Sequence, residues 1–88
     1  MILAIMSYEK VFGLTLQTLR LKLNFSQSEL AKASQIDRTF ISLLERGLRQ
    51  PSLTTIFSLA FALKMKPSEL IAAVELSIRR ARWKRLKT

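Results

Sequence analysis

The sequence contains no cysteine and no histidine among its 88 residues. Without cysteine the chain cannot form a disulfide or a thiolate metal site, and without histidine it lacks the commonest general base and the commonest transition-metal ligand. Acidic residues are few as well, with six Asp and Glu in total. Most of these are expected to cap helices or to pair with arginine, so no pair of carboxylates remains for acid–base catalysis. The composition therefore argues against an enzyme and predicts no metal or other cofactor.

Long apolar runs are also absent. The opening stretch MILAIM has only six residues and lacks a basic flank, so it is too short for a signal peptide or a membrane span. The methionine at position 6 offers an alternative start, in which case the first five residues are an upstream extension. We expect a soluble, cytoplasmic chain with no membrane partner.

Basic residues are abundant by contrast. Fifteen Lys and Arg give a formal net charge of +9, while 49% of the residues are hydrophobic and can form a core. Such a surplus on so small a body favours a polyanionic partner, nucleic acid first and an anionic membrane second. A basic protein without any such partner is the alternative. No segment suggests a small-molecule ligand.

The apolar periodicity predicts an all-α fold. Strand signals are absent, and glycine and proline occur only twice each, at helix ends apart from Gly13. We expect one domain over 1–88, with a core of about 8–76 and a basic C-terminal helix and tail over 77–88. The expected helices are 8–23, 26–33, 37–47, 52–63 and 67–86. The first of these helices has Phe12, Leu16, Leu19 and Leu23 on one face. The fourth is expected to bury a stripe of Ile56, Leu59, Ala60 and Leu63.

Two helix starts lie close together in the segment SQSELAKASQIDRTFISLLERG, residues 26–47. Ser26 and Glu29 have the spacing of a capping box, and Asp37 is a good N-cap for the following helix. Two helices joined by so short a turn cross steeply, and the second can stand out from the body.

The second of these helices has a polar outer face. Ile41 and Leu44 share one side, and the opposite side holds the four residues Arg38, Thr39, Ser42 and Leu43. Arginine can bond bidentately to guanine, hydroxyls bond several bases, and aliphatic groups contact the thymine methyl in a B-DNA major groove. We therefore predict that these four residues read bases in double-stranded DNA. Two alternatives stay open: Arg38 contacts a phosphate, and Ser42 is only a solvated residue.

This segment, followed by PSLTTIFSLAFAL, resembles the helix-turn-helix regulators of the phage-repressor, Cro and XRE type. The resemblance implies a five-helix, lambda-repressor-like DNA-binding domain that binds palindromic operators as a homodimer. The stretch IDRTFIS is similar to the controller proteins of restriction–modification systems.

The resemblance also assigns roles to individual residues. It places Ser26 and Gln27 at phosphate contacts, together with Arg46, and it makes Arg20 and Glu45 an ion pair between two helices. Arg49, in the loop after the second helix, is expected to contact phosphate. Two departures stand out: the family turn has glycine where we place Ser34, and Leu43 is apolar where polar base readers are common.

The last helix continues an apolar face through Leu70, Ile71, Val74 and Ile78. An exposed stripe of this kind marks a partner surface, and by resemblance it is the dimer interface. The tail RRARWKRLKT then adds six positive charges. Three interpretations compete for it: an arm on flanking phosphates, a dimer contact through Trp83 and Leu86, or a helix on an anionic membrane.

The function these features predict is a sequence-specific transcriptional regulator that acts as a dimer on an operator near a promoter. An antitoxin that binds a partner toxin as well as DNA is the main alternative. A third hypothesis is an RNA-binding or bridging protein with a degenerate helix-turn-helix. Because the major groove of an A-form duplex is too narrow for a reading helix, a strong preference for B-DNA would exclude it.

Overall fold

The structure, a computed structural model, describes residues 7–87, with side chains as far as Ala81. Over these residues the chain forms five helices and no strand, as the all-α prediction required. Each helix lies within a few residues of its expected position. The helices are α2 (Tyr8–Lys22), α3 (Gln27–Ser34), α4 (Arg38–Glu45), α5 (Leu53–Ala62) and α6 (Pro67–Lys87).

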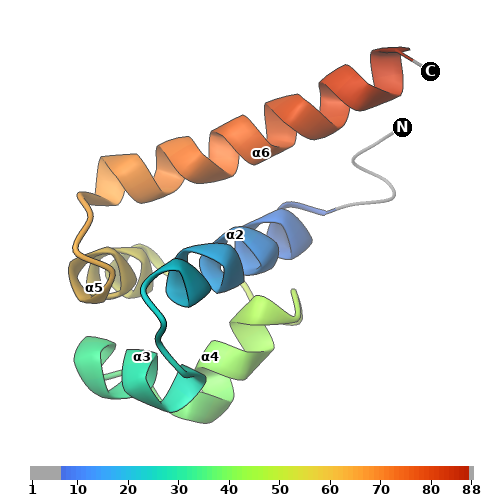
Figure 1. Ribbon diagram of the computed structural model, residues 1–88. Helices are drawn as coiled ribbons and strands as arrows, with labels where there is room; N and C mark the ends of the chain where they lie inside the picture. Colours follow the sequence, from blue (N-terminus) through green and yellow to red (C-terminus); the bar gives the residue numbers. More distant parts are fainter. Residues whose placement is uncertain (1–6, 88) are drawn as a thin grey trace.

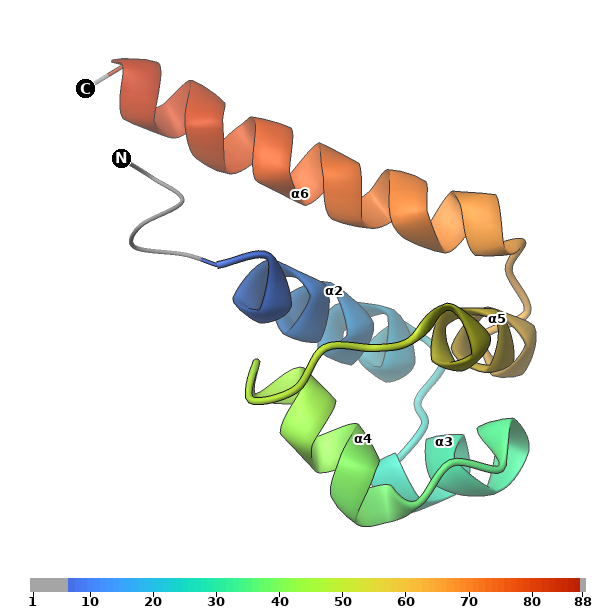
Figure 2. The same ribbon diagram turned by 180° about the vertical axis from the view of Figure 1, so that it is seen from behind.

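The helices are arranged in three levels. The short helices α3 and α4 lie at one end of the molecule, α2 and α5 lie across the middle, and the long helix α6 lies over α2 and α5 at the other end (Figures 1 and 2). The elongated α6 helps to give the protein principal extents of 41 × 24 × 23 Å.

Local signals set the helix ends. Ser26, Asp37 and Ser52 all cap helices through their side chains, as predicted, and Ser7 caps α2 in the same way. Asn24 follows α2 with φ of 58°, the left-handed conformation expected of it.

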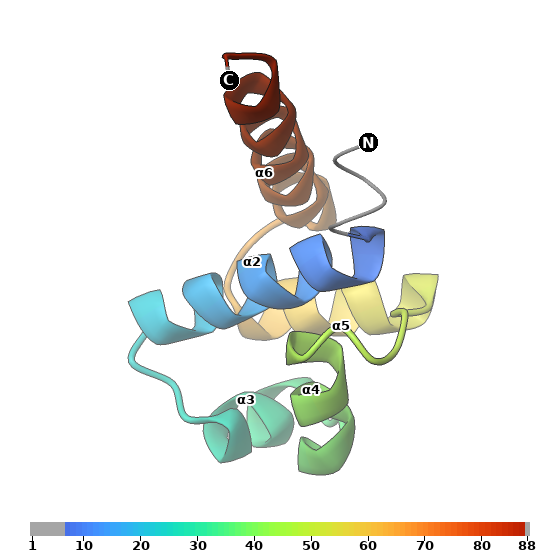
Figure 3. The same cartoon turned by 90° about the vertical axis from the view of Figure 1, so that its right-hand side faces the viewer.

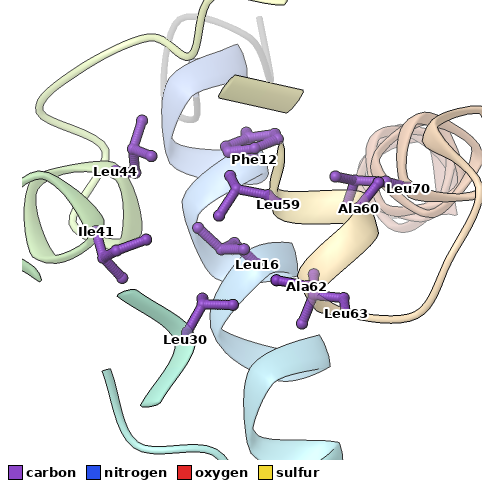
Figure 4. Close-up of a cluster of buried hydrophobic side chains, with 10 residues drawn as sticks. All are labelled: Phe12, Leu16, Leu30, Ile41, Leu44, Leu59, Ala60, Ala62, Leu63 and Leu70. Atoms are coloured by element: carbon purple, nitrogen blue, oxygen red, sulfur yellow. The ribbon is translucent and has the colours of Figure 1, made fainter. Parts of the chain in front are cut away.

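A single apolar cluster joins all five helices (Figure 4). Its largest fully buried side chains are Leu16, Leu30, Ile41, Leu44, Leu59 and Leu70. Complete burial of such a side chain stabilises a fold by about 1.5–3 kcal/mol, so each of these six contributes substantially to the stability of the protein. Leu23, the last residue on the predicted apolar face of α2, is 38% exposed, because it is the C-cap and lies beyond the turns that pack.

None of the helices between residues 7 and 87 is both long and apolar enough to cross a bilayer. The MILAIM stretch, and with it the choice between Met1 and Met6 as the start, lies outside the described residues.

Candidate nucleic-acid interface

The start of α3 is held by a reciprocal cap. The Glu29 amide donates to Ser26 Oγ at 3.0 Å, and the Ser26 amide donates to Glu29 Oε1 at 2.7 Å. The next amides, those of Gln27 and Ser28, have no partner within the helix. Together with the positive end of the helix dipole, they form a surface suited to a phosphate.

The turn between α3 and α4 is short because α3 stops sharply. Gln35 is its C-cap, with φ of 58° and ψ of 34°, and the Ile36 amide reaches back to the Ala31 carbonyl at 3.1 Å. The left-handed residue is therefore Gln35, and our assignment of the family's glycine position to Ser34 was wrong by one residue. Ser34 instead ends α3, buried, with its hydroxyl donating to the Leu30 carbonyl at 2.7 Å.

Asp37 fixes the entry into α4. Its Oδ2 accepts from the Thr39 amide at 2.9 Å, which satisfies one of the first donors of the helix. Ile41 and Leu44 then point into the core, both fully buried. This anchors one side of α4 and leaves its other side at the end of the molecule (Figure 3).

The four predicted base readers lie on that outer side to different extents. Arg38 and Thr39 are exposed, whereas Ser42 and Leu43 are half-buried. The first turn of α4 therefore offers long and polar groups, and the second turn offers a flatter surface. Base reading by these residues remains a prediction.

A buried ion pair supports α4 from behind. Arg20 Nε lies 2.6 Å from Glu45 Oε2, and its second nitrogen donates to Oε1 at 3.0 Å, so the pair is bidentate, as the resemblance implied. The side chains are 9% and 2% exposed. A third donor of Arg20 bonds the Phe25 carbonyl at 2.7 Å, which ties α2 to the start of α3.

The hydrogen bonds from Arg20 to Glu45 raise the pKa of this guanidinium above its usual value, while burial opposes them. A cation whose pKa is raised by folding contributes stability at every pH below its unfolded value. The part of the stability that depends on the protonation of Arg20 is therefore lost as the pH rises to strongly alkaline values.

The ion pair extends to the protein surface through Gln27. Gln27 Nε2 donates to Glu45 Oε1 at 3.0 Å, and Gln27 Oε1 accepts from Arg38 at 3.2 Å. A carboxylate only accepts and a guanidinium only donates, so the amide has one favourable orientation between them. The sequence analysis did not predict this chain, whose members come from α2, α3 and α4. We call Arg20, Glu45, Gln27 and Arg38 the relay.

The relay changes the interpretation of one predicted phosphate contact. Because the Gln27 side chain bonds to both neighbours, the backbone amide of Gln27 is the group left available for a phosphate. Arg46 and Arg49 are exposed, and their guanidinium groups bond only carbonyls of the same segment, those of Ser42 and Leu48. Both can therefore turn toward a phosphate.

Two features of α2 that the sequence analysis did not use also place α4. Lys10 Nζ donates to the Arg46 carbonyl at 3.3 Å, at the negative end of α4. Gly13 faces the same helix end so closely that an added Cβ would lie 2.3 Å from the Leu44 carbonyl oxygen. A glycine within a helix is a signal of such close approach, and here it lets the two backbones meet.

The predicted dimer residues on α6 separate into two groups. Leu70 is fully buried in the core of its own chain, so it cannot contact a second copy. Val74 packs partly on the same core. Ile71 is 46% exposed and Ile78 is half-buried, so both keep accessible apolar surface.

Larger apolar groups are exposed on α5, and the sequence analysis missed them. Leu53, Phe57 and Phe61 are spaced by four residues and are 72%, 55% and 80% exposed. This spacing puts them on one side of the helix. The i, i+4 repeat of large apolar residues was the available signal. We call these three residues the α5 stripe.

Known proteins resemble this chain in sequence and in fold. Residues 16–70 match the helix-turn-helix family. The control protein C.BamHI of Bacillus amyloliquefaciens is 40% identical over 62 residues, covering 69% of this chain and 76% of that protein. The crystal structure of the restriction–modification controller protein C.AhdI from Aeromonas hydrophila is similar with a TM-score of 0.68 at 42% identity, over 70% of this chain and 94% of the other.

A more distant structure shares the fold alone. The restriction–modification controller protein C.Esp1396I, solved as a tetramer in complex with its natural 35-base-pair operator, has a TM-score of 0.76 at 22% identity. The similarity covers 82% of this chain and 95% of that one.

Proposed function

We propose that this chain binds an operator as a homodimer and reads bases through the outer side of α4. The chain belongs to the helix-turn-helix family of transcriptional regulators. The family assignment made from the sequence is thereby confirmed. The similarity of this chain to C.BamHI and C.AhdI favours the controller-protein branch of the family.

The observation that carries the proposal is the relay. Arg38 is exposed at the start of α4, and its guanidinium is held by an amide that is itself fixed to a buried ion pair. A long side chain held in one place loses less conformational entropy on binding than a mobile one, so it discriminates bases better. Arginine in this setting suits the O6 and N7 acceptors of guanine.

Phosphate contacts fall on both sides of α4. The free amides at the start of α3 lie on one side, and Arg46 and Arg49 follow α4 on the other. These groups would hold the DNA backbone and set the position of the protein along the duplex without reading the base sequence.

The α5 stripe, together with Ile71, supports a symmetric dimer. Three large apolar side chains at 55% exposure or more on one helix form a surface that a second copy could cover. We propose that this surface, without Leu70, forms the dimer interface, and that the dimer presents two copies of α4 about 34 Å apart on one face of the duplex.

The proposal includes no catalytic step. Glu9, Glu29, Asp37, Glu45 and Glu69 all accept hydrogen bonds in caps or side-chain pairs. We propose further that the protein acts in the cytoplasm, where an operator of this kind would be found.

Selection from a randomised duplex library at physiological salt tests this function. We expect a palindromic or directly repeated motif, and the variant Arg38→Ala should lose preference at one base pair of each half-site. A bidentate arginine–guanine contact discriminates by about 1–3 kcal/mol, so the loss at that pair should be measurable. Arg46→Ala should instead weaken all sequences alike and make the salt slope shallower by about 1.

Lys66→Ala is the matched control, since it removes the same charge from an exposed position just before α6, outside the proposed DNA contacts. Retention of DNA without any motif would contradict the proposal. So would an Arg38→Ala variant that selects the wild-type motif unchanged.

A further inference from the structure

The basic segment of α6, residues 79–87, extends beyond the part of this helix that packs. Leu70 lies in the core, Val74 packs against it, and Ser77 Oγ lies 3.2 Å from Thr15 Oγ1 on α2. After these contacts the helix continues without a break to Lys87. Arg79 and Arg80, the first basic residues of the segment, are exposed.

Most of the net charge of the protein is concentrated there. Residues 79–88 hold six Lys and Arg and no acidic residue, while the whole chain has a net charge of +9. The remaining 78 residues therefore carry one third of the surplus. A charge of this density on one short segment indicates a polyanionic ligand.

The segment lies at the wrong end of the molecule to contact the operator. In all three views α6 lies at one end, α3 and α4 lie at the other, and α2 and α5 lie between them (Figures 1–3). A helix of nine residues is about 14 Å long and does not fold back. The sequence-based expectation of an arm on flanking phosphates conflicts with this geometry.

We propose that the basic segment of α6 is a second nucleic-acid surface that binds the phosphates of another DNA duplex, so that the operator-bound dimer joins two duplexes. This inference rests on the proposed function, because it takes α4 to be occupied by the operator. Lysine and arginine bind phosphates by displacing condensed counterions, which needs no base sequence and no prepared pocket. Two such segments, one from each copy, would serve the same second duplex.

A membrane surface fits the segment less well. Helices that lie in a bilayer interface combine basic residues with a wide apolar face. Between 79 and 87 the only apolar residues larger than alanine are Trp83 and Leu86, against six basic ones. DNA is therefore the partner we commit to.

A bead-capture assay tests the inference with the full-length protein. Beads carry the operator duplex found by library selection, and a fluorescent duplex without operator sequence is added. Operator occupancy and captured fluorescence are read from the same beads. We expect wild-type protein to capture the second duplex, with a steep dependence on salt.

The informative variant is the triple substitution Lys84→Gln, Arg85→Gln and Lys87→Gln. It should bind the operator within about threefold of wild type and lose at least about tenfold in capture of the second duplex. Because each phosphate contact contributes about 0.9 to the salt slope, the slope for capture should become shallower by about 2–3. Circular dichroism checks that α6 remains helical.

A matched triple substitution removes the same charge elsewhere, with Lys22, Lys64 and Lys66 each changed to Gln. It should retain capture, which separates a local site from the effect of net charge. Equal losses in both triple variants would overturn the inference, as would operator binding by wild type without any capture. Loss of operator affinity in the first triple variant would show that the segment contacts the operator after all.

The last test measures binding of the protein to vesicles of phosphatidylserine and phosphatidylcholine. If the protein binds them more tightly than the second duplex, and the Lys84, Arg85 and Lys87 variant loses this binding, the partner is a membrane and the inference is wrong. Failure to select any operator motif would count against the proposed function instead, because the two readouts are scored separately.

Discussion

Replacing Gly13 by alanine sets two effects of opposite sign against each other. Alanine in a helix interior is more favourable than glycine by up to about 1 kcal/mol. The new Cβ would, however, lie 2.3 Å from the Leu44 carbonyl oxygen and 2.6 Å from that of Glu45, where ordinary contacts begin at 3.4 Å. Since both obstacles are backbone atoms, α2 and α4 would have to separate by roughly an ångström.

Overpacking of this kind costs typically about 1–3 kcal/mol, and the rigid obstacle here favours the upper part of that range. We therefore expect Gly13→Ala to lower the free energy of unfolding by about 1–2 kcal/mol after the gain in helix propensity. For a domain of this size the melting temperature should fall by about 5–15 °C. Urea and thermal denaturation followed by circular dichroism measure both quantities.

Thr18→Ala is the control, because it changes an exposed position of the same helix. Its effect should stay within about 0.5 kcal/mol. The reasoning is refuted if Gly13→Ala is as stable as wild type or more stable, because the gain in helix propensity would then equal or exceed the cost of the contact with the α4 carbonyls.

Three further predictions concern the relay, the turn and the α5 stripe. Glu45→Gln leaves the buried Arg20 without its counter-charge and should reduce unfolding free energy by roughly 3 kcal/mol in urea titrations, whereas an unchanged midpoint would show that the pair contributes nothing. Gln35→Gly should stabilise the protein by about 0.5–1 kcal/mol, because glycine adopts the left-handed conformation at position 35 without strain, and Ser34→Gly should destabilise it. The opposite order of melting temperatures would place the turn glycine at position 34. Phe61→Ser should raise the dimer dissociation constant at least tenfold in analytical ultracentrifugation without lowering the melting temperature of the monomer, and a dimer of unchanged affinity would exclude the stripe from the interface.

Features set by neighbouring residues were predictable from the sequence. Ser26, Asp37 and Ser52 cap helices through atoms two or three residues away, so the pattern alone located those helix starts. The left-handed conformation of Asn24 was predictable for the same reason. The single-residue error at Ser34 arose because the length of α3 depends on how far its hydrogen bonds continue, which no short pattern states.

Features that depend on packing between helices were not predictable. Leu70 belongs to an apolar stripe in which Ile71 is exposed and Ile78 is half-buried, and only the position of α6 over α2 and α5 shows that Leu70 is buried. The hydrogen bonds of Gln27 require Glu45 and Arg38 to meet it from another helix. Neither the burial of Leu70 nor these bonds can be derived from spacing along the chain.

The relay also limits how this protein could be retargeted to a new operator. Transplanting another protein's reading residues onto α4 would replace Arg38 while Gln27 still offers its carbonyl oxygen to that position. A substituted residue that only accepts hydrogen bonds, such as glutamate, would face that oxygen without a donor between them. Repulsion between the two acceptors would turn the new side chain away from the DNA groove. On the proposed function, a change of specificity at position 38 therefore calls for a compatible residue at 27, and a change at 27 must still satisfy Glu45.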